Sequence, residues 1–588
     1  MTTTATPPAA DPVSGRLSHQ QILWVIFGLL MGMLLAALDQ TIVTTAMRTI
    51  ADELHGQTAQ AWITTAYLIT STAATPLYGK LSDIYGRKPL YLTAISIFVV
   101  GSLLCGLAQS IYELAAYRAV QGLGAGGLFS VALAIVADIV APRERGRYMG
   151  YFMAVFGLSS VAGPVVGGFF AGVDSFLTFS GWRWVFLINV PVGLIALFVV
   201  SRVLNLPHHR VDHRVDYWGA LTLTVGLVPL LIVAEQGREW GWTSRTSLLM
   251  YAVGAVGVIL FLIVEWAMGD EALVPLRLFR NGAFSLINVI MFVTGMGMFG
   301  GLLVLPLYLQ IVRGYSPTSA GLLSLPMTFG MMTAMAVSNV VITRFGRYKI
   351  LPIIGSAVMT VALFLSSNLK VETPMWQVGL LMVLLGMGLG MCMQTLMLAV
   401  QTEAGPRDMG VATATGTFTR QIGGTVGAAV FMSVLFSVVG NRIAEAFERN
   451  AAHVQAALTD PAVLSDPANA AVIEMLQTGN GANADLDDTS FLSSLDERLA
   501  RPFLEGFASA MDTVFAVTSA ITLLAFVLMW FVRERPLPSK SGLEMIAEEE
   551  AAAEAASASG NAPAATDAGK SDAEITSDGE ERVTTPRT

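Results

Sequence analysis

The sequence predicts an all-α, multi-pass membrane protein, and three observations carry that prediction. Apolar residues make up 54% of the chain and charged residues only 13%, against roughly 25% charged in soluble domains. Fourteen apolar segments are each long enough to cross a hydrocarbon core of about 30 Å as a helix. Helices are required because lipid offers no hydrogen-bond partners to an open backbone.

The basic residues of the short loops predict how these spans are oriented. Loops on one side carry two or three lysines or arginines each, among them Lys80, Arg87 and Lys88, whereas loops on the other side carry one or two, such as Arg183. Because basic loops stay in the cytoplasm, both chain termini are predicted to be cytoplasmic. The spans are centred near residues 34, 69, 98, 125, 159, 192, 226, 257, 296, 330, 360, 387, 424 and 519.

A weak internal repeat predicts two six-helix halves separated by two inserted helices. The dipeptide Gly-Arg at 86–87 follows the second span, and the same dipeptide at 346–347 follows the tenth, which is the second span of the last six. Parallel repeats of this kind are typical of transporters whose halves rock against each other. The second copy has Thr343 in place of Asp83, so no gating role is assigned to it.

These features divide the chain into five predicted segments. The outer two are a disordered N-terminus and a disordered acidic tail, both cytoplasmic. The inner three are a six-helix half, a pair of inserted helices, and a second six-helix half with a polar external loop before its last span. In chain order the segments are 1–20, 21–205, 206–281, 282–535 with the loop at 441–504, and 536–588.

Composition also excludes several classes of function. Acidic residues concentrate in 441–504 and 536–588, so the membrane body is mildly basic despite a net charge of −9, and nothing indicates nucleic-acid binding. Cys105 and Cys392 lie inside apolar runs and are predicted to be inert core residues, not a disulfide or a metal site. The chain lacks the ATPase motif G-x-x-x-x-G-K-S/T, so we expect no cofactor and a proton gradient as the energy source.

Asp39 is an acidic residue inside the first span, where an ionisable group is costly unless it faces a cavity or a partner. Arg118 lies in the fourth span, which runs the opposite way, and both are predicted to lie roughly 10–12 Å below the external surface. Equal depth allows pairing, and protonation of Asp39 would then weaken the pair and couple a proton to a conformational change. The alternative is a static ion pair that only fixes helix packing. Gln121 follows Arg118 by three positions and is predicted to orient it.

Two stretches are rich in small residues. "YRAVQGLGAGG" at 117–127 satisfies G-x-G-x-x-G, but a dinucleotide site needs a preceding strand, so close helix packing is the better interpretation. "GLSSVAGPVVGG" at 157–168 places glycines around a proline, which removes a backbone hydrogen bond and permits bending. It is either ordinary small-residue packing or a mobile helix against the opposite half, and the glycine density favours the second. Its key positions are Gly157, Gly163, Pro164, Gly167 and Gly168.

Four isolated charged residues complete the set of candidates. Arg420 lies about twelve residues into the thirteenth span, and it either contacts substrate or coupling groups or is neutralised by a neighbour. Asp216 directly precedes the seventh span and is predicted to be a helix N-cap. Glu265, near the cytoplasmic end of the eighth span, is predicted to be interfacial and not a proton site, and Asp512 is a weaker transport candidate.

Four motifs taken together resemble those of the major facilitator superfamily: "GKLSDIYGRK", "YRAVQGLGAGG", "GLSSVAGPVVGG" and, in the first span, "LDQTIVTTAM". With fourteen spans the chain is similar to the fourteen-helix drug:proton antiporters of that family. The resemblance extends over about residues 20–535. It implies the major facilitator fold, with Asp39 and Arg118 in proton coupling.

The same resemblance implies a gate in the loop at 79–90. Asp83 is implied to lie against the cytoplasmic end of a helix in the other half and to pair with a nearby arginine. A carboxylate at a helix N-terminus is favourable, and the eleventh span starts on this side. Gly79 permits a close helix crossing and Gly86 suits a tight turn. The implied conformational gate consists of Gly79, Asp83, Gly86, Arg87 and Lys88.

These inferences predict an exporter, not an enzyme, that moves amphipathic or lipophilic small molecules such as drugs out of the cell in exchange for protons. Spans nine to thirteen offer no obvious acid for a cationic drug, which keeps a dedicated exporter of an endogenous lipid, antibiotic or metabolite as the alternative. A non-transporting receptor or scaffold is less favoured, because a scaffold needs no buried acid. We expect a monomer in the plasma membrane, and the excess of arginine over lysine indicates a bacterial source.

Overall fold

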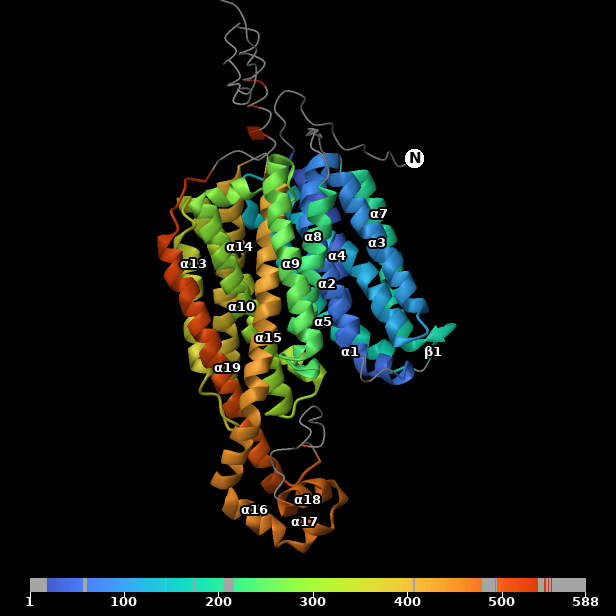
Figure 1. Ribbon diagram of the computed structural model, residues 1–588, viewed down its shortest axis with the longest axis vertical. Coiled ribbons are helices and arrows are strands. Elements are labelled where there is room, and N and C mark those ends of the chain that lie inside the picture. Colours follow the sequence, from blue (N-terminus) through green and yellow to red (C-terminus); the bar gives the residue numbers. More distant parts are fainter. Residues whose placement is uncertain are drawn as a thin grey trace, which may run out of the picture.

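A bundle of long helices forms the body of the molecule, and a group of short helices lies beyond one end of it (Figure 1). The computed structural model describes residues 18–55, 61–142, 144–173, 175–204, 216–405, 408–478, 492, 494–537, 544, 545, 548 and 551. Most of the predicted N-terminal segment 1–20 and of the acidic tail 536–588 lies outside these residues.

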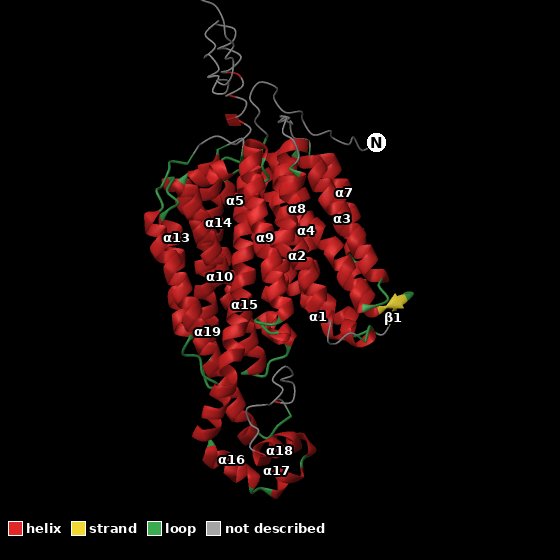
Figure 2. Ribbon diagram, in the orientation of Figure 1, coloured by secondary structure: helices red, strands yellow, loops and turns green. Residues whose placement is uncertain are grey.

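The helices confirm the all-α membrane fold. Within the described residues, twelve helices are long and apolar enough to cross a membrane. Two further helices of the bundle correspond to the two remaining predicted spans of the fourteen. They are α2 (Ala61–Tyr85) and the shorter apolar α13 (Ile350–Ser366). The described strands form only a two-stranded hairpin, β1 (Ser175–Phe176) and β2 (Phe179–Ser180), at one end of the bundle (Figure 2).

The N-terminal half begins where Ser18 and Gln21 form a capping box that satisfies free backbone amides at the start of its first helix. Its core is a layer of large apolar side chains, including Tyr91, Phe98 and Leu128. The helices of this half are α1 (His19–Glu53), α2, α3 (Arg87–Leu107), α4 (Ile111–Ile139), α5 (Arg145–Ala171), α6 (Trp184–Leu187) and α7 (Asn189–Val203).

The inserted pair consists of α8 (Tyr217–Trp240) and α9 (Arg245–Met268). Asp216 caps α8 as predicted, because its carboxylate accepts a hydrogen bond of 2.6 Å from the amide of Gly219. Leu227 and its neighbours on α8 pack against α2 and α15 (Met409–Arg449), so this helix touches both halves. The other inserted helix, α9, packs on α8 and exposes a row of apolar side chains on its opposite side, as a lipid-facing helix does.

The C-terminal half repeats the turn of the first half. Gly86, between α2 and α3, and Gly346, between α12 and α13, both have positive φ angles, of 93° and 66°. Glycine adopts this conformation without the strain that a Cβ would cause. The helices of this half are α10 (Gly282–Ile311), α11 (Pro317–Leu323), α12 (Leu325–Phe345), α13, α14 (Met375–Ala404), α15 and α19 (Glu497–Phe531).

The predicted external loop 441–504 contains helices and a small core of its own. Helix α15 continues to its end at Arg449, and the chain then forms α16 (Ala451–Leu458), α17 (Pro461–Ser465) and α18 (Ala470–Thr478). Val454, Ala457, Val463, Ile473 and Leu499 pack together. The amphipathic stretches of this loop therefore bury their apolar faces against one another, and the group of short helices α16–α18 is called the external subdomain below.

Arg498, at the start of α19, joins that helix to the external subdomain through Asp460 at the start of α17, and we expect the stability of the subdomain to depend on pH as a result. It contacts Asp460 at 3.0 Å and Asp496 at 2.9 Å, and these hydrogen bonds lower the pKa of both carboxyls from their ordinary value. A depressed pKa stabilises the fold above the unfolded-state value of about 3.9, and this contribution is lost as the pH falls through the folded-state pKa. We expect hydrogen–deuterium exchange of residues 451–478, corrected for intrinsic rates, to accelerate below about pH 5.

The matched variants are Arg498→Gln and Arg442→Gln. The first is expected to raise exchange at neutral pH and to flatten the pH dependence. In the second, the lost pair with Glu445 joins residues of one helix only, at 3.1 Å, so exchange of the subdomain should stay as in the wild type. An unchanged pH profile in Arg498→Gln would contradict the assignment.

Candidate functional site

Asp39 and Arg118 form a buried ion pair in the middle of the N-terminal half. The guanidinium Nη1 of Arg118 on α4 lies 2.6 Å from Oδ2 of Asp39 on α1, and the two residues are 1% and 0% exposed. The structure thus brings together two residues that the sequence placed at equal depth. An unpaired charge at such a site costs several kcal/mol, so each group depends on the other.

Three neutral side chains complete the hydrogen bonding of this pair. Gln121 donates from Nε2 to Oδ1 of Asp39 at 2.9 Å and accepts from Arg118 at 2.7 Å. Asn189 on α7 donates to the same Oδ1 at 2.8 Å, and Ser102 on α3 accepts from both amides. The sequence identified Gln121 by its spacing, but Asn189 and Ser102 come from helices that carry no motif at those positions. Side chains of α1, α4 and α7 therefore meet at one carboxylate, and α3 supports the two amides that donate to it.

Tyr67 lies between the ion pair and a central cavity. Cζ of Arg118 is 4.1 Å from the centre of the Tyr67 ring, a cation–π distance. The same tyrosine lines the cavity, and its hydroxyl has no hydrogen-bond partner within the described residues. A change in the charge balance of Asp39 and Arg118 thus has a direct contact through which it can alter the cavity wall.

The cavity has a volume of about 360 Å³ and lies between the two halves. This volume is in the range of small-molecule sites. Four phenylalanines, Phe129, Phe152, Phe156 and Phe299, supply flat apolar surface, and five methionines supply adaptable surface. The methionines are Met33, Met298, Met335, Met393 and Met397.

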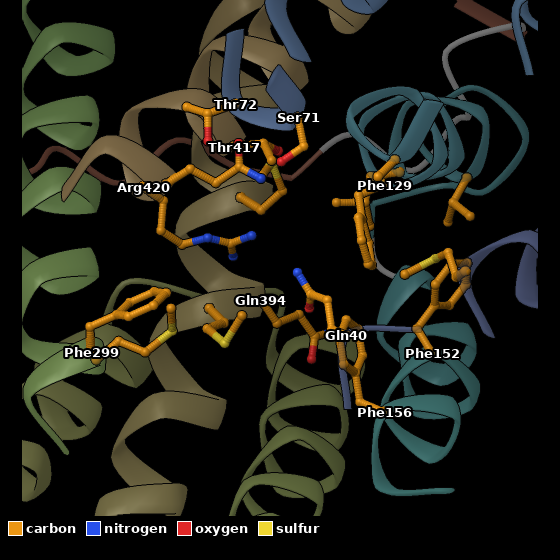
Figure 3. A pocket seen from close by; sticks show the side chains of 18 of the residues that line it. Gln40, Ser71, Thr72, Phe129, Phe152, Phe156, Phe299, Gln394, Thr417 and Arg420 are labelled. Atoms are coloured by element: carbon orange, nitrogen blue, oxygen red, sulfur yellow. The ribbon is translucent and has the colours of Figure 1, made fainter. Parts of the chain in front are cut away.

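Arg420 on α15 projects into this cavity, with Gln394 and Gln40 across from it (Figure 3). The sequence left open whether Arg420 meets substrate or is neutralised by a neighbour. Within the described residues it has neither a salt bridge nor a hydrogen bond to a side chain. Gln394 is similar, since its buried Oε1 has no partner there. Polar groups left open toward a cavity are available to a ligand.

The gate residues lie at the end where the basic loops lie, and there Gly79 and Asp83 of α2 contact the opposite half. Oδ2 of Asp83 accepts a hydrogen bond of 3.1 Å from the amide of Val411, in the first turn of α15. Arg87 is 2.5 Å from Oδ1 of Asp83 and 2.7 Å from Asp138 on α4. Lys88 donates to the carbonyl of Ser201 at 2.7 Å, within its own half. The carboxylate of Asp83 therefore acts as a cap supplied by another helix.

The helix that Asp83 caps differs from the expected one. The sequence pointed to the eleventh span, which is α13, whereas the structure places Asp83 on α15, the thirteenth. Both helices start on this side, so polarity alone does not separate them. Close backbone approach decides the pairing: a Cβ at Gly79 would collide with that of Ala414, and a Cβ at Gly410 would collide with the Asp83 carboxylate.

Arg145 forms a second contact between the halves that the sequence interpretation missed. It was counted only as a basic loop residue, but it is buried and donates to Oε1 of Gln401 on α14 at 2.6 Å. It also donates to the carbonyls of Ala137 and Val140. Arg145 and Gln401 both line the cavity, so this contact closes the cavity wall next to the gate.

The α5 motif faces two directions. Gly163 and Gly167 lie against α1 of the same half, where a Cβ would collide with Thr41 or approach the Ile42 carbonyl. Gly157 faces Thr328 on α12, and Pro164 is near α11, both in the opposite half. Gly168 has open space around it. The motif thus contributes to packing within its own half and to contact with the opposite half, and the mobility of this helix stays a prediction.

The remaining candidates lie outside the cavity. Glu265 lies near the end of α9, is fully buried within the protein and accepts from the amide of Val274 at 2.9 Å, so its interfacial position stays a prediction. Asp512 on α19 is partly buried and does not line the cavity. Gly122, Gly124 and Gly127 lie within α4 and pack closely on neighbouring helices. Among the described residues, no group of three or more His, Cys, Asp or Glu is arranged to hold a metal ion.

Comparison with known proteins assigns the fold and the motifs to one family. The sequence model of the Major Facilitator Superfamily matches residues 29–428. The multidrug transporter protein MdtP of Bacillus subtilis is 35% identical over 432 residues, which are 73% of this chain and 78% of that protein. A tetracycline resistance determinant of Streptomyces rimosus is 40% identical over 348 residues, 59% of this chain and 98% of that protein. Other relatives include fungal efflux pumps, so the bacterial source stays a prediction.

The fold is also that of solved structures in this family. The proton:xylose symporter XylE, bound to a bromodeoxyglucose, superimposes with a TM-score of 0.55 over 90% of this chain and 100% of that chain. The two sequences are only 15% identical, so the likeness concerns the fold alone.

Proposed function

This chain belongs to the major facilitator superfamily, and from that premise we propose that it is a proton-coupled exporter of amphipathic small molecules that works by alternating access. Its relatives and its fold are those of transporters and not of enzymes, as the sequence predicts. Relatives named for multidrug transport and tetracycline resistance support export as the direction. We further propose the plasma membrane as its location, a monomer as its functional unit, and no cofactor.

The observation that carries this proposal is the contact of a buried ion pair with the cavity. Protonation of Asp39 would remove the charge that Arg118 pairs with and weaken the bond at 2.6 Å. Arg118 would still be held by Gln121 and by the carbonyl of Ile63, and its interaction with the Tyr67 ring would change. Because that ring lines the cavity, occupancy of the cavity and protonation of Asp39 are coupled in both directions.

The gate supplies the conformational part of the proposal. Asp83 and Arg145 join the halves through α15 and α14 at the end that carries the basic loops. Both contacts must break before the cavity opens on that side. A transporter whose gate contacts compete with cavity opening alternates between two states instead of forming a continuous pore.

The direct test is transport by purified protein in proteoliposomes under an imposed pH gradient. We expect a panel of amphipathic dyes to move against the proton flux, and a protonophore to abolish this movement. Empty liposomes control for passive permeation. Transport that persists unchanged after the gradient collapses would contradict proton coupling. Binding without transport of any compound would favour the scaffold alternative.

A further inference from the structure

The charges in the wall of the central cavity are unusual for a binder of cationic drugs. Of the described residues that line it, the charged ones are Arg145 and Arg420, and none is Asp or Glu. Four glutamines supply most of the remaining polarity: Gln40, Gln394, Gln401 and Gln421. The wall therefore presents positive charge and amide groups to whatever enters.

The two arginines differ in how far their guanidinium groups are hydrogen-bonded within the protein. The guanidinium of Arg145 already donates hydrogen bonds within the protein. Its acceptors are the neutral oxygens of Ala137, Val140 and Gln401. The carboxylate of Asp138 is near enough to act on it, but that group is bound to Arg87 at 2.7 Å and does not line the cavity. Arg145 thus places at the cavity wall a positive charge that Asp138 partly offsets, and its guanidinium is engaged by three protein acceptors.

Arg420 is the open donor. It lies where α15 passes the cavity, and its guanidinium points into the space bounded by Phe299, Gln394 and Gln40 (Figure 3). No acidic side chain of the described residues is close enough to offset its charge. A guanidinium inside a membrane protein is costly without a counter-charge, and its fork of N–H groups matches planar oxyanions. The missing counter-charge is most simply the substrate's own.

We propose that the exported substrate is an amphipathic organic anion, with its carboxylate or sulfonate on Arg420 and its apolar body among the phenylalanines. This inference rests on the proposed function and names its substrate class. Within the described residues no donor reaches the Oε1 of Gln394, so this side chain can turn its NH₂ group toward the same anion. The phenylalanines and methionines around the cavity suit a flat apolar body of variable shape.

An anionic substrate has an electrical consequence. Export of an anion and entry of a proton each make the interior more positive. An inside-negative membrane potential therefore drives both movements. Exchange of a monovalent cation for one proton moves no net charge. The dependence of transport on membrane potential therefore reports the charge of the substrate independently of any mutation.

The test compares three probes that share one aromatic body and differ in charge: pyrenebutyrate, pyrenebutanol and pyrenebutylamine. Binding to the detergent-solubilised full chain is measured by pyrene fluorescence against a blank of the same detergent. We expect the anion to bind at least tenfold more tightly than the amine. In proteoliposomes, an inside-negative potential set with potassium and valinomycin should accelerate its export.

Variants locate the effect on one residue. Arg420→Gln is expected to weaken anion binding by roughly ten- to a hundredfold, the range for losing a hydrogen bond to a charged group, and to leave the alcohol unchanged. Arg420→Lys should restore part of the anion preference. Arg344→Gln removes an exposed arginine at the end of α12 and should change nothing.

The outcomes separate this inference from the proposed function. Tighter binding or faster gradient-driven export of the amine than of the anion would overturn the anionic class while leaving proton-coupled export intact. Equal binding of all three probes, or binding of none, would also overturn it. No transport of any dye under a pH gradient would contradict the proposed function itself.

Discussion

Asp39→Asn is expected to abolish export driven by a pH gradient, with a fall of at least tenfold in rate, while substrate binding is retained. Asparagine keeps the size of the side chain and an oxygen that can accept from Gln121 and Asn189. It removes the charge that pairs with Arg118 and turns an N–H group toward it. Without a titratable group at this position, no proton is bound and released in the cycle. The measurement is export from proteoliposomes with and without the gradient.

The same substitution also leaves Arg118 buried without a counter-charge, and loss of one partner of a buried pair costs about 3–5 kcal/mol. Loss of transport must therefore be distinguished from loss of folding. The double variant Asp39→Asn, Arg118→Gln removes both charges and is expected to regain thermal stability without regaining coupling. If the double variant restored gradient-driven export as well, the pair would be a packing element and not the coupling site.

The ion pair shows what a sequence can predict about such a site. Asp39 and Arg118 stand out because charged residues inside apolar spans are rare, and their depth follows from helix geometry. Asn189, Ser102 and Tyr67 carry no such signal, because polar neutral residues occur in many spans. Their role depends on how α7, α3 and α2 are rotated about their axes, which span counting leaves undetermined.

For the gate, counting spans does not determine which helix of the opposite half is the partner. The loop at 79–90 could be recognised from its charges and glycines, but the partner helix could not. Odd-numbered spans all start at the cytoplasmic end and all offer the same backbone amides. Only the close crossing of Gly79 with Ala414, and the room that Gly410 leaves for a carboxylate, select α15. Arg145 was missed for a related reason, since a base after a span is expected from topology alone.

Asp83→Asn is expected to shift the conformational equilibrium toward opening at the cytoplasmic end by about tenfold and to slow export accordingly. Loss of a charge at a helix N-terminus costs roughly 0.3–2 kcal/mol, and Arg87 loses one of its two carboxylate partners at the same time. A shift of this size is visible as a change in populations. The measurement is the distance distribution between spin labels introduced at Tyr85 and Phe345, which are exposed ends of α2 and α12 in opposite halves.

A control acid at the same helix end makes this prediction specific. Asp408 directly precedes α15 and pairs with Arg277 at 2.9 Å, but it makes no side-chain hydrogen bond to the start of α15. Asp408→Asn removes an equal charge from the same place, so a general electrostatic effect would appear in both variants. If Asp83 caps α15 from the opposite half, the conformational shift is expected in Asp83→Asn and not in Asp408→Asn. Because Cys105 and Cys392 are buried, labelling in all variants reports on the introduced thiols. Equal shifts in the two variants, or no shift in Asp83→Asn, would show that the contact at Val411 follows closure of the halves and does not hold them closed.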